Sequence, residues 1–321
     1  MRIVFFGSAQ FGVPCLEAID RSQHELVGIF TQPARPAGRK RELRPTEVAL
    51  WASAHGCNCI EAENINQPNM VELVAACRGD LLVVIAFGQK IGHDVIDLFS
   101  KGAINVHASL LPKYRGAGPI YWALMNGESE TGVTIITLAD KMDAGLMLGR
   151  GKTSINPQDT SQTLHDRLSE VAVPTLMHAI DQIDAGTAVY TPQDESQVTL
   201  APKLKKIHGY IDWNKPAGAV VNQIRALWPW PGAQAVYVSS ATGRSNRVII
   251  RSARPVSCRV NCTPGTLNGD LNICCGQDAI CIEELKPAGS HLMSYESFVN
   301  GRASQPGDLF LPVDHVLREV L

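Results

Sequence analysis

The stretch MRIVFFGSAQFGVPCLEAI, residues 1–19, opens the chain with the pattern that decides its fold class. Its short apolar run, Arg2–Phe6, ends at a Gly turn without a small-residue cleavage site, so we interpret it as a strand rather than a signal peptide. Similar runs rich in Val and Ile recur and are predicted as strands: Leu26–Thr31, Leu81–Ala86, Ala103–Val106 and Val133–Leu138. They are apolar on both faces, which is typical of buried parallel strands.

Helical stretches separate these strands, among them Pro45–His55, Gln67–Cys77 and Pro119–Asn126. Strands that alternate with helices form an open sheet with right-handed crossovers. The first part of the chain therefore predicts an α/β fold, a Rossmann-like, doubly wound and mostly parallel sheet. In such sheets ligands bind beyond the carboxyl ends of the strands. A dinucleotide is not expected there, because Gly7–Gly12 lacks the middle Gly of the G-x-G-x-x-G motif.

The pattern changes after a long predicted helix, Thr160–Gly186. The polar segment that follows predicts a linker, and beyond it short β-prone segments and one helix, Pro216–Leu227, favour a small OB-like β-barrel. We therefore predict a catalytic domain over 1–189, a linker over 190–206 and a barrel over 207–321. The barrel strands are predicted at Ala235–Ser239, Arg247–Arg251, Leu271–Cys275 and Ala279–Glu283, and three aromatic residues are interpreted as packing residues: Trp213, Trp228 and Trp230.

Composition excludes several classes of protein. The net charge of −2 over 321 residues argues against a general polyanion binder, so any nucleic-acid contact must come from local clusters. No run approaches the roughly 18 apolar residues of a membrane helix, and we expect a cytoplasmic protein. Nothing in the sequence requires more than a monomer.

The nine cysteines are interpreted as inert thiols, because a chain of this size does not need disulfides to fold. Four of them lie near one another in the barrel region: Cys258, Cys262, Cys274 and Cys275. Their spacing lacks the two-residue chelate loops of zinc sites and no histidine is close, so a metal is not expected.

Polar residues with catalytic chemistry follow two neighbouring strands. Strand alternation places Asn105 and His107 on one face, about 6.7 Å apart along the strand. The next strand leads into a loop in which Asp143 can return a carboxylate toward the imidazole. Such a set can stabilise an oxyanion with donors and accept a proton, without a metal. The spacing alone does not separate a catalytic set from a structural histidine.

The surrounding string, INVHASLLPKYRGAGPIYWALMNGESETGVTI at 104–135, resembles the folate-dependent formyltransferases. In that family the Asn, the His and the loop Asp are catalytic, which implies this role for Asn105, His107 and Asp143. The resemblance implies 10-formyltetrahydrofolate as the co-substrate and no metal. It also implies a folate site formed by Ala86, Phe87, Gly88, Gln89, Lys90, Ile91, Ser109, Leu110, Leu111 and Pro112.

One departure from the family pattern lies in the Asp143 loop. The family loop usually carries a second acid three residues after the first, whereas this chain has Leu146. Because the first Asp is the one assigned chemistry, we expect activity to survive. The hydrogen bonding of the loop is the part that the departure puts in question.

The amine acceptor is indicated by a basic segment and by the second domain. Five of the ten residues from Arg35 to Arg44 are basic, and Pro and Gly predict an irregular loop that suits phosphate contacts. This loop resembles the one that enters the acceptor stem in the tRNA-formylating members of the family, with Arg39 at the position of their important arginine. The segment Ile224–Ala233 is similar as well. The implied tRNA-binding residues are Arg35, Arg39, Lys40, Arg41, Lys203 and Lys206; Lys205, Arg225, Arg247 and Arg251 are further candidates for a positive path.

The expected activity is therefore transfer of a formyl group from 10-formyltetrahydrofolate to the amino group of initiator methionyl-tRNA, for translation initiation. An amino-sugar-nucleotide N-formyltransferase remains the enzymatic alternative, because such enzymes carry a similar second domain. A purine-precursor transferase needs no second domain and is disfavoured. A non-catalytic folate- or RNA-binding homologue is disfavoured by the intact polar set.

Overall fold

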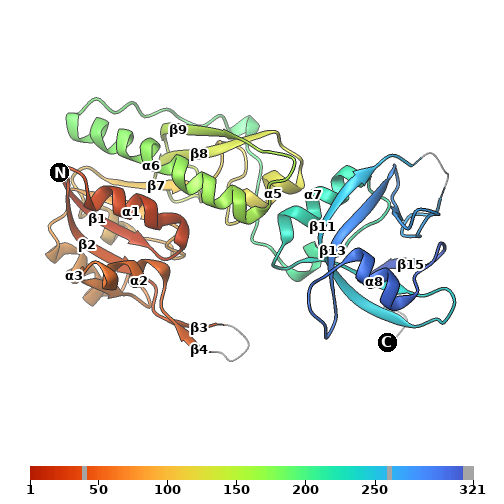
Figure 1. The fold of residues 1–321 in the computed structure, drawn as a ribbon. Coiled ribbons are helices and arrows are strands. Elements are labelled where there is room, and N and C mark those ends of the chain that lie inside the picture. Colours follow the sequence, from red (N-terminus) through yellow and green to blue (C-terminus); the bar gives the residue numbers. More distant parts are fainter. Residues whose placement is uncertain (38–41, 259–261, 314–321) are drawn as a thin grey trace. The chain divides into compact units, whose positions relative to one another are not determined.

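The computed structural model describes residues 1–37, 42–258 and 262–313, which form two units (Figure 1). The N-terminal unit comprises Met1–Gly116, Glu130–Ser154 and His165–Ala201. The C-terminal unit comprises Ala117–Ser129, Ile155–Leu164 and Pro202–Leu321. Two short pieces of the predicted catalytic domain thus group with the barrel, and the predicted boundaries at 189 and 207 stay a prediction.

A seven-stranded sheet forms the centre of the N-terminal unit, in the order β5-β2-β1-β6-β7-β8-β9. Five strands are parallel, whereas β8 and β9 are antiparallel. The prediction that Val133–Leu138 is a parallel strand is wrong, because this run belongs to β8 and pairs antiparallel with β7. The strands are β1 (Arg2–Gly7), β2 (Glu25–Thr31), β5 (Cys59–Glu61), β6 (Leu81–Ile85), β7 (Ala103–His107), β8 (Glu130–Thr137) and β9 (Met147–Ser154).

Helices cover both faces of this sheet, as right-handed crossovers require. One face packs an apolar cluster of strand residues such as Phe6 and Val84 against Val74 and Val95 of two helices. On the other side, His24, which directly precedes β2, contacts Asp181 of the long helix α6, with Nε2 and Oδ1 3.1 Å apart. The helices are α1 (Val13–Asp20), α2 (Glu47–Ala54), α3 (Pro68–Ala76), α4 (His93–Ile96) and α6 (Ser161–Ala185), with a 3₁₀ turn η1 (Gln10–Gly12).

The basic segment 35–44 is a β-hairpin on its described residues rather than the irregular loop that Pro and Gly suggested. Strands β3 (Arg35–Ala37) and β4 (Glu42–Arg44) pair antiparallel, with Arg35 opposite Arg44. Figure 1 shows the two strands projecting from the sheet that carries them. Pro36 is compatible with this arrangement because a two-stranded ribbon is edge on both sides.

An antiparallel six-stranded sheet curls into a nearly closed barrel in the C-terminal unit. The order is β12-β13-β11-β10-β15, with β14 beside β13. Two isolated bridges, Thr266 to Leu309 and Leu267 to Ile273, link β15 back toward β12. The elements are α5 (Pro119–Met125), η3 (Lys206–Gly209), α7 (Ala217–Leu227), β10 (Ala233–Val238), β11 (Ser245–Val256), β12 (Ile273–Cys274), β13 (Ala279–Pro287), β14 (Met293–Ser294), α8 (Tyr295–Arg302) and β15 (Leu309–Pro312).

Two sequence interpretations of this unit change. Trp213 packs in the barrel core at 2% exposure, as predicted, but Trp230 is 52% exposed and is not a packing residue. The interpretation of all cysteines as thiols is wrong, because Cys262 and Cys274 form a disulfide. Sequence spacing could not reveal this pair, because the barrel brings together residues that lie 12 positions apart on different segments.

Within residues 1–37, 42–258 and 262–313, no helix has both the length and the apolar character needed to cross a bilayer.

Candidate active site

Strand β7 carries the first two polar residues, Asn105 and His107, to the edge of the sheet. Asn105 lies opposite Val84 of β6 and Ile136 of β8, so it is held from both sides. His107 is the last residue of β7 and is 5% exposed, while Asn105 is half-buried. Among the described residues the Asn105 side-chain amide has no hydrogen-bond partner, which leaves it open to a ligand.

Both ring nitrogens of His107 face protein oxygens. Nε2 lies 2.9 Å from the carbonyl oxygen of Tyr114, and Nδ1 lies 3.5 Å from Oδ1 of Asp143. A carbonyl only accepts, so Nε2 donates to the Tyr114 carbonyl and Nδ1 is the nitrogen that faces the Asp143 carboxylate.

Asp143 sits in a constrained loop between β8 and β9. Its φ of 53° lies in the left-handed region, and Oδ2 accepts a hydrogen bond of 2.8 Å from the Gly116 amide. Two residues on, a Cβ at Gly145 would overlap the carbonyl oxygen of Thr137. Glycine is therefore required at this position, and the tight approach directs the carboxylate back toward β7.

The substitution of Leu146 for the family acid leaves the loop intact. The Leu146 amide donates to Thr137 Oγ1 at 2.9 Å, and its carbonyl accepts from the Thr137 amide at 2.9 Å. The Leu146 side chain itself is 41% exposed. Because the loop is closed through backbone groups, the hydrogen bonding that the sequence put in question does not depend on this side chain.

The Asp143 loop is held by residues that sequence reasoning missed. Gln193 Nε2 donates to the carbonyls of Asp143 at 2.7 Å and Gly145 at 2.9 Å. Its Oε1 accepts from the buried guanidinium of Arg115 at 3.0 and 2.8 Å. Arg115 in turn donates to Glu195 at 2.6 Å, and this bond, with one from Lys141, keeps the pKa of Glu195 below its usual value.

Two of these supporting residues, Gln193 and Glu195, come from the segment that was predicted as a linker. Thr191 pairs with Met147 of β9, and Thr199 and Ala201 exchange hydrogen bonds with Arg115. The segment up to Ala201 is therefore attached to the N-terminal unit. Its polar composition carried no signal for this role, because polar linkers and polar side chains that support a loop look alike in sequence.

The predicted folate segment 86–91 follows β6 and is fixed by its neighbours. The Phe87 carbonyl accepts from Gln32 Nε2 at 2.9 Å, and a Cβ at Gly88 would overlap the same amide. Gln89 bonds to Ile65 and Ala62 on the facing loop at 2.9 and 2.7 Å. Ala86 and Gly88 have positive φ, Phe87 and Ile91 are buried, and Lys90 is exposed. The backbone of this segment is therefore held in one conformation, which recognition of a ligand by backbone groups requires.

The second predicted folate segment, 109–112, forms a buried turn next to His107. Ser109 Oγ donates to the Lys113 carbonyl at 2.7 Å, so its hydroxyl is used inside the turn. Leu111 is 1% exposed and packs on Ile136 and Met147. Leu110 is half-buried and Pro112 is buried. The turn therefore offers a fixed surface beside Asn105 and His107 rather than hydrogen-bond donors from its side chains.

The predicted tRNA-binding residues fall into three groups. Arg35 is exposed on the hairpin and pairs with Glu63 at 2.8 Å. Arg39, Lys40 and Arg41 lie outside the described residues. Lys203 and Lys206 are exposed in the C-terminal unit. Of the further candidates Arg225, Arg247 and Arg251, each bonds to a neighbouring protein group, whereas Lys205 is exposed.

Comparisons with known proteins find formyl transferases that are similar over almost the whole chain. A family model described as "Formyl transferase" matches residues 1–180, and one described as "Formyl transferase, C-terminal domain" matches residues 203–303. A methionyl-tRNA formyltransferase of Trichlorobacter lovleyi is 40% identical over 316 residues, 97% of each chain. That of Solibacter usitatus is 39% identical, covering 94% of this chain and 96% of its own.

Solved structures share the fold at low identity. A sugar 3N-formyl transferase, WlaRD, aligns with a TM-score of 0.63 at 16% identity, over 91% of this chain and 99% of its own. HypX from Aquifex aeolicus, in complex with tetrahydrofolic acid, aligns with a TM-score of 0.59 at 17% identity, over 95% of this chain and 48% of its own. With both domains matched in order and relatives near 40% identity over full length, the chain belongs to the formyl transferase family.

Proposed function

We propose that this chain transfers the formyl group of 10-formyltetrahydrofolate to the free amino group of methionyl-initiator tRNA. The observation that carries the proposal is the ordered set at the end of β7, in which Asp143 faces the His107 ring beside an available Asn105 amide. Relatives named methionyl-tRNA formyltransferase, alike over both domains, support the tRNA acceptor. We place the activity in the cytoplasm and in a monomer.

The proposed reaction begins when the amine nitrogen attacks the formyl carbon. A new C–N bond forms and the carbonyl oxygen becomes an oxyanion, which the Asn105 amide stabilises by donating a hydrogen bond. His107 holds its ring beside the Asp143 carboxylate, because its two nitrogens are directed at Tyr114 and Asp143. Asp143 accepts the amine proton, directly or through water. The bond from the formyl carbon to N10 of the folate then breaks, and N10 takes the proton.

The folate donor is assigned to the backbone of 86–91 and to the turn 109–112. Fixed backbone donors and acceptors suit a flat heterocycle such as pterin, and the buried side chains of Phe87 and Ile91 anchor the segment. No step of the proposed chemistry is routed through a metal ion.

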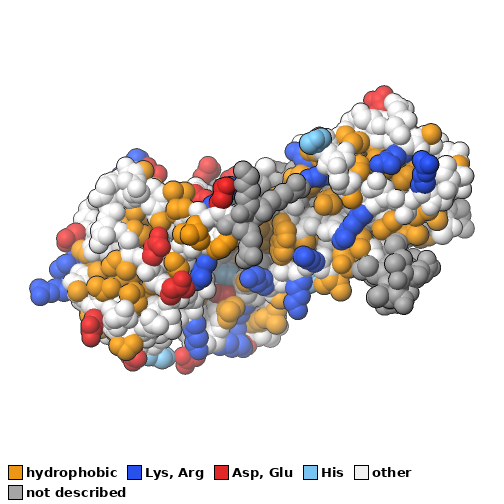
Figure 2. Space-filling view, turned by 90° about the horizontal axis from the view of Figure 1, so that it is seen from below, with side chains coloured by type: hydrophobic (Ala, Val, Ile, Leu, Met, Phe, Trp, Pro, Cys, Tyr) orange, Lys and Arg blue, Asp and Glu red, His pale blue; other side chains and the backbone are white. Residues whose placement is uncertain are grey.

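A positive surface supports an RNA acceptor. On the face of the C-terminal unit seen in Figure 2, Lys and Arg side chains are frequent and acidic side chains are rare. Such a surface attracts phosphates without sequence specificity. The remaining predicted contacts are Arg35, which is exposed on the N-terminal hairpin, and Arg39, Lys40 and Arg41.

Purified protein tests the proposal when 10-formyltetrahydrofolate is offered with two acceptors in separate reactions. We expect formyl-methionyl-tRNA to accumulate with initiator tRNA, detected by its loss of positive charge on acid gels. A dTDP-linked amino sugar should remain unmodified. Formylation of the sugar without formylation of the tRNA would favour the alternative enzyme, and formylation of neither would favour a non-catalytic homologue.

A further inference from the structure

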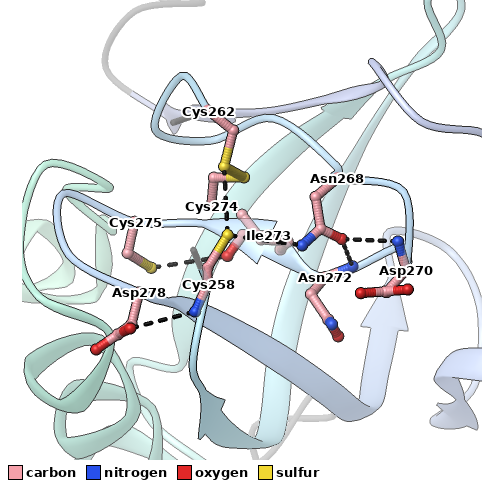
Figure 3. The surroundings of a disulfide bond; sticks show 9 residues. All are labelled: Cys258, Cys262, Asn268, Asp270, Asn272, Ile273, Cys274, Cys275 and Asp278. Carbon is pink, nitrogen blue, oxygen red and sulfur yellow. Dashed lines mark hydrogen bonds between the residues drawn. A yellow bond between two sulfur atoms is a disulfide. The ribbon is translucent and has the colours of Figure 1, made fainter. Parts of the chain in front are cut away.

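Three cysteines meet at one end of the barrel in the C-terminal unit, and none of them belongs to the set assigned to formyl transfer. Cys258 and Cys262 follow β11, and Cys274 ends β12. Their sulfur atoms all lie within 4.8 Å of one another. Cys262 and Cys274 form the disulfide, and the Cys258 sulfur lies 3.8 Å from that of Cys262 (Figure 3).

We propose that Cys258, Cys262 and Cys274 form a thiolate site for Zn²⁺ when the disulfide is reduced. Zinc–sulfur bonds of about 2.3 Å place neighbouring sulfurs of a tetrahedral site about 3.8 Å apart. The separation of the Cys258 and Cys262 sulfurs, 3.8 Å, already has this value. After reduction, the Cys274 sulfur needs only to move away from Cys262 to complete the triangle.

The backbone around the site is held independently of the sulfur atoms. The Cys274 amide donates to the Thr266 carbonyl at 2.9 Å, and its carbonyl accepts from the Gly265 amide at 2.8 Å. The Cys258 amide donates to Asp278 Oδ1 at 3.2 Å. Two of the three ligands therefore keep their places whether or not the disulfide is present.

An oriented amide lies beside the cluster, as in the outer shell of metal sites. Asn268 Oδ1 accepts from the backbone amides of Asp270 at 3.0 Å and Asn272 at 2.9 Å. These two bonds fix the side chain so that Nδ2 points at the Cys258 sulfur, 3.9 Å away (Figure 3). A donor in this position is placed to hydrogen-bond to a metal-bound sulfur.

Cys275 is not a fourth ligand. It follows Cys274 directly, so strand alternation directs it to the other face, where it packs in the barrel core. Burial raises the pKa of its thiol to about 12, and its sulfur lies near the Ile273 carbonyl. Cys258 and Cys262 are half-buried, so water can reach the fourth position of the metal.

The chemistry balances with a dithiol reductant. Reduction of Cys262–Cys274 takes two electrons and two protons from the dithiol, which becomes a disulfide. Binding of Zn²⁺ then releases the thiol protons of the three ligands to solvent. The barrel end is thus linked by a covalent bond in the oxidised protein and by a metal in the reduced protein.

Cobalt titration of the full chain tests the site without any readout of formyl transfer. The protein is reduced under nitrogen, freed of reductant, and checked for nine titratable thiols after unfolding. We expect a single equivalent of Co²⁺ to give an intense thiolate-to-cobalt charge-transfer band, which Zn²⁺ abolishes by displacement. Oxidised protein, checked for seven thiols because two of the nine are paired, should show no band.

Cys258→Ser is the decisive variant, because it removes a ligand and leaves the disulfide partners unchanged. We expect its Zn²⁺ affinity to fall more than tenfold, and that of Asn268→Ala to fall about tenfold. Cys281→Ser is the matched control, since Cys281 is a half-buried thiol on β13 outside the cluster, and it should bind as the unaltered chain does. The proposal is wrong if reduced protein gives no band, if Cys258→Ser keeps it, or if oxidised protein binds equally well.

Discussion

At the residue scale, the imidazole of His107 connects the end of β7 with the Asp143 loop. His107 ends β7, and its contacts reach Tyr114 on one side and Asp143 on the other. A carboxylate beside the imidazole ring restricts the orientation of the ring, and the ring restricts that of the carboxylate. The charge of Asp143 therefore matters for proton acceptance and for the arrangement of the ring.

Asp143→Asn should separate the charge of this residue from its shape. The amide can still accept from Gly116, but it cannot take the amine proton, so we expect kcat to fall by at least about 100-fold with little change in the KM for folate. Steady-state formylation of methionyl-tRNA measures both constants. Asp140→Asn, in the same loop but 84% exposed and paired with His93, is the control and should leave kcat unchanged. Near-normal turnover of Asp143→Asn would remove the residue from the catalytic set.

Gln193→Ala tests whether the loop must be held from behind. Without Gln193 the carbonyls of Asp143 and Gly145 lose their donor, and a small displacement of the carboxylate is enough to lower kcat by roughly tenfold or more. The KM for folate should stay nearly constant, because the hydrogen bonds of Gln193 go to the Asp143 loop and to Arg115. The melting temperature should fall only modestly, since the buried Arg115 guanidinium loses one acceptor and keeps Glu195. Gln197→Ala is the matched control, since the Gln197 side chain bonds to nearby Asp194. A large drop in melting temperature with unchanged kcat would indicate a purely structural role.

At the scale of the element, the β3–β4 hairpin belongs to the segment that is proposed to contact an RNA acceptor. Arg35 forms an ion pair with Glu63, whereas Arg39 is proposed to contact phosphates. We expect Arg39→Ala to raise the KM for tRNA several-fold and to weaken its dependence on salt, and Arg35→Ala to have a smaller effect. Kinetics at several salt concentrations measure this, with Lys152→Ala on β9 as a control for loss of one surface charge. Equal tRNA kinetics in Arg39→Ala and the unaltered chain would make the hairpin an ordinary surface element.

The segment Thr191–Ala201 has a role in the structure that differs from the one predicted from its sequence. Its polar residues and proline are typical of a linker. In the folded chain it pairs with Met147 and Arg115, and it supplies Gln193 and Glu195 to the catalytic loop. The functional part of the N-terminal unit thus extends past the last helix of its sheet.

At the scale of the whole molecule, the buried carboxylate of Asp308 joins several segments of the barrel by hydrogen bonds. Asp308 accepts from Tyr237 at 2.5 Å and from Ser240 and Gln305 at 2.7 to 3.0 Å. Burial raises the pKa of Asp308, but these hydrogen bonds lower it by more, so it lies below its usual value. The ionised form therefore stabilises the C-terminal unit.

Asp308→Asn should destabilise this unit by roughly 2 to 3 kcal/mol, because hydrogen bonds to a charged acceptor are lost. A depressed pKa stabilises the fold above the pKa of the unfolded chain, about 3.9, and this stabilisation is lost as pH falls through the folded value. The difference between the two proteins should therefore be full at neutral pH and shrink at acid pH. Urea unfolding at several pH values measures it, and a difference that does not vary with pH would contradict the assignment.

Five of the seven strands of the sheet (β1, β2, β6, β7 and β8) and the positions of Asn105 and His107 were predictable from sequence, because apolar runs and strand alternation are local properties. The short β5 and the largely polar β9 were missed, because neither is an apolar run. The direction of β8 was not predictable, since an apolar strand reads the same in parallel and antiparallel pairing. The exposure of Trp230 was also missed, because residue type alone does not say which aromatic side chain the core has room for.

The sequence by itself determined the two domains' class, the family and the string from Asn105 to Pro112 that resembles the family, because short-range patterns and an ordered motif carry that information. Only the tertiary structure showed that Gln193 and Arg115 hold the Asp143 loop and that Cys258 lies beside the Cys262–Cys274 disulfide. Such contacts join residues far apart in the chain, or on segments whose paths meet only after folding. No local periodicity records them, so the packing of the whole chain decides them.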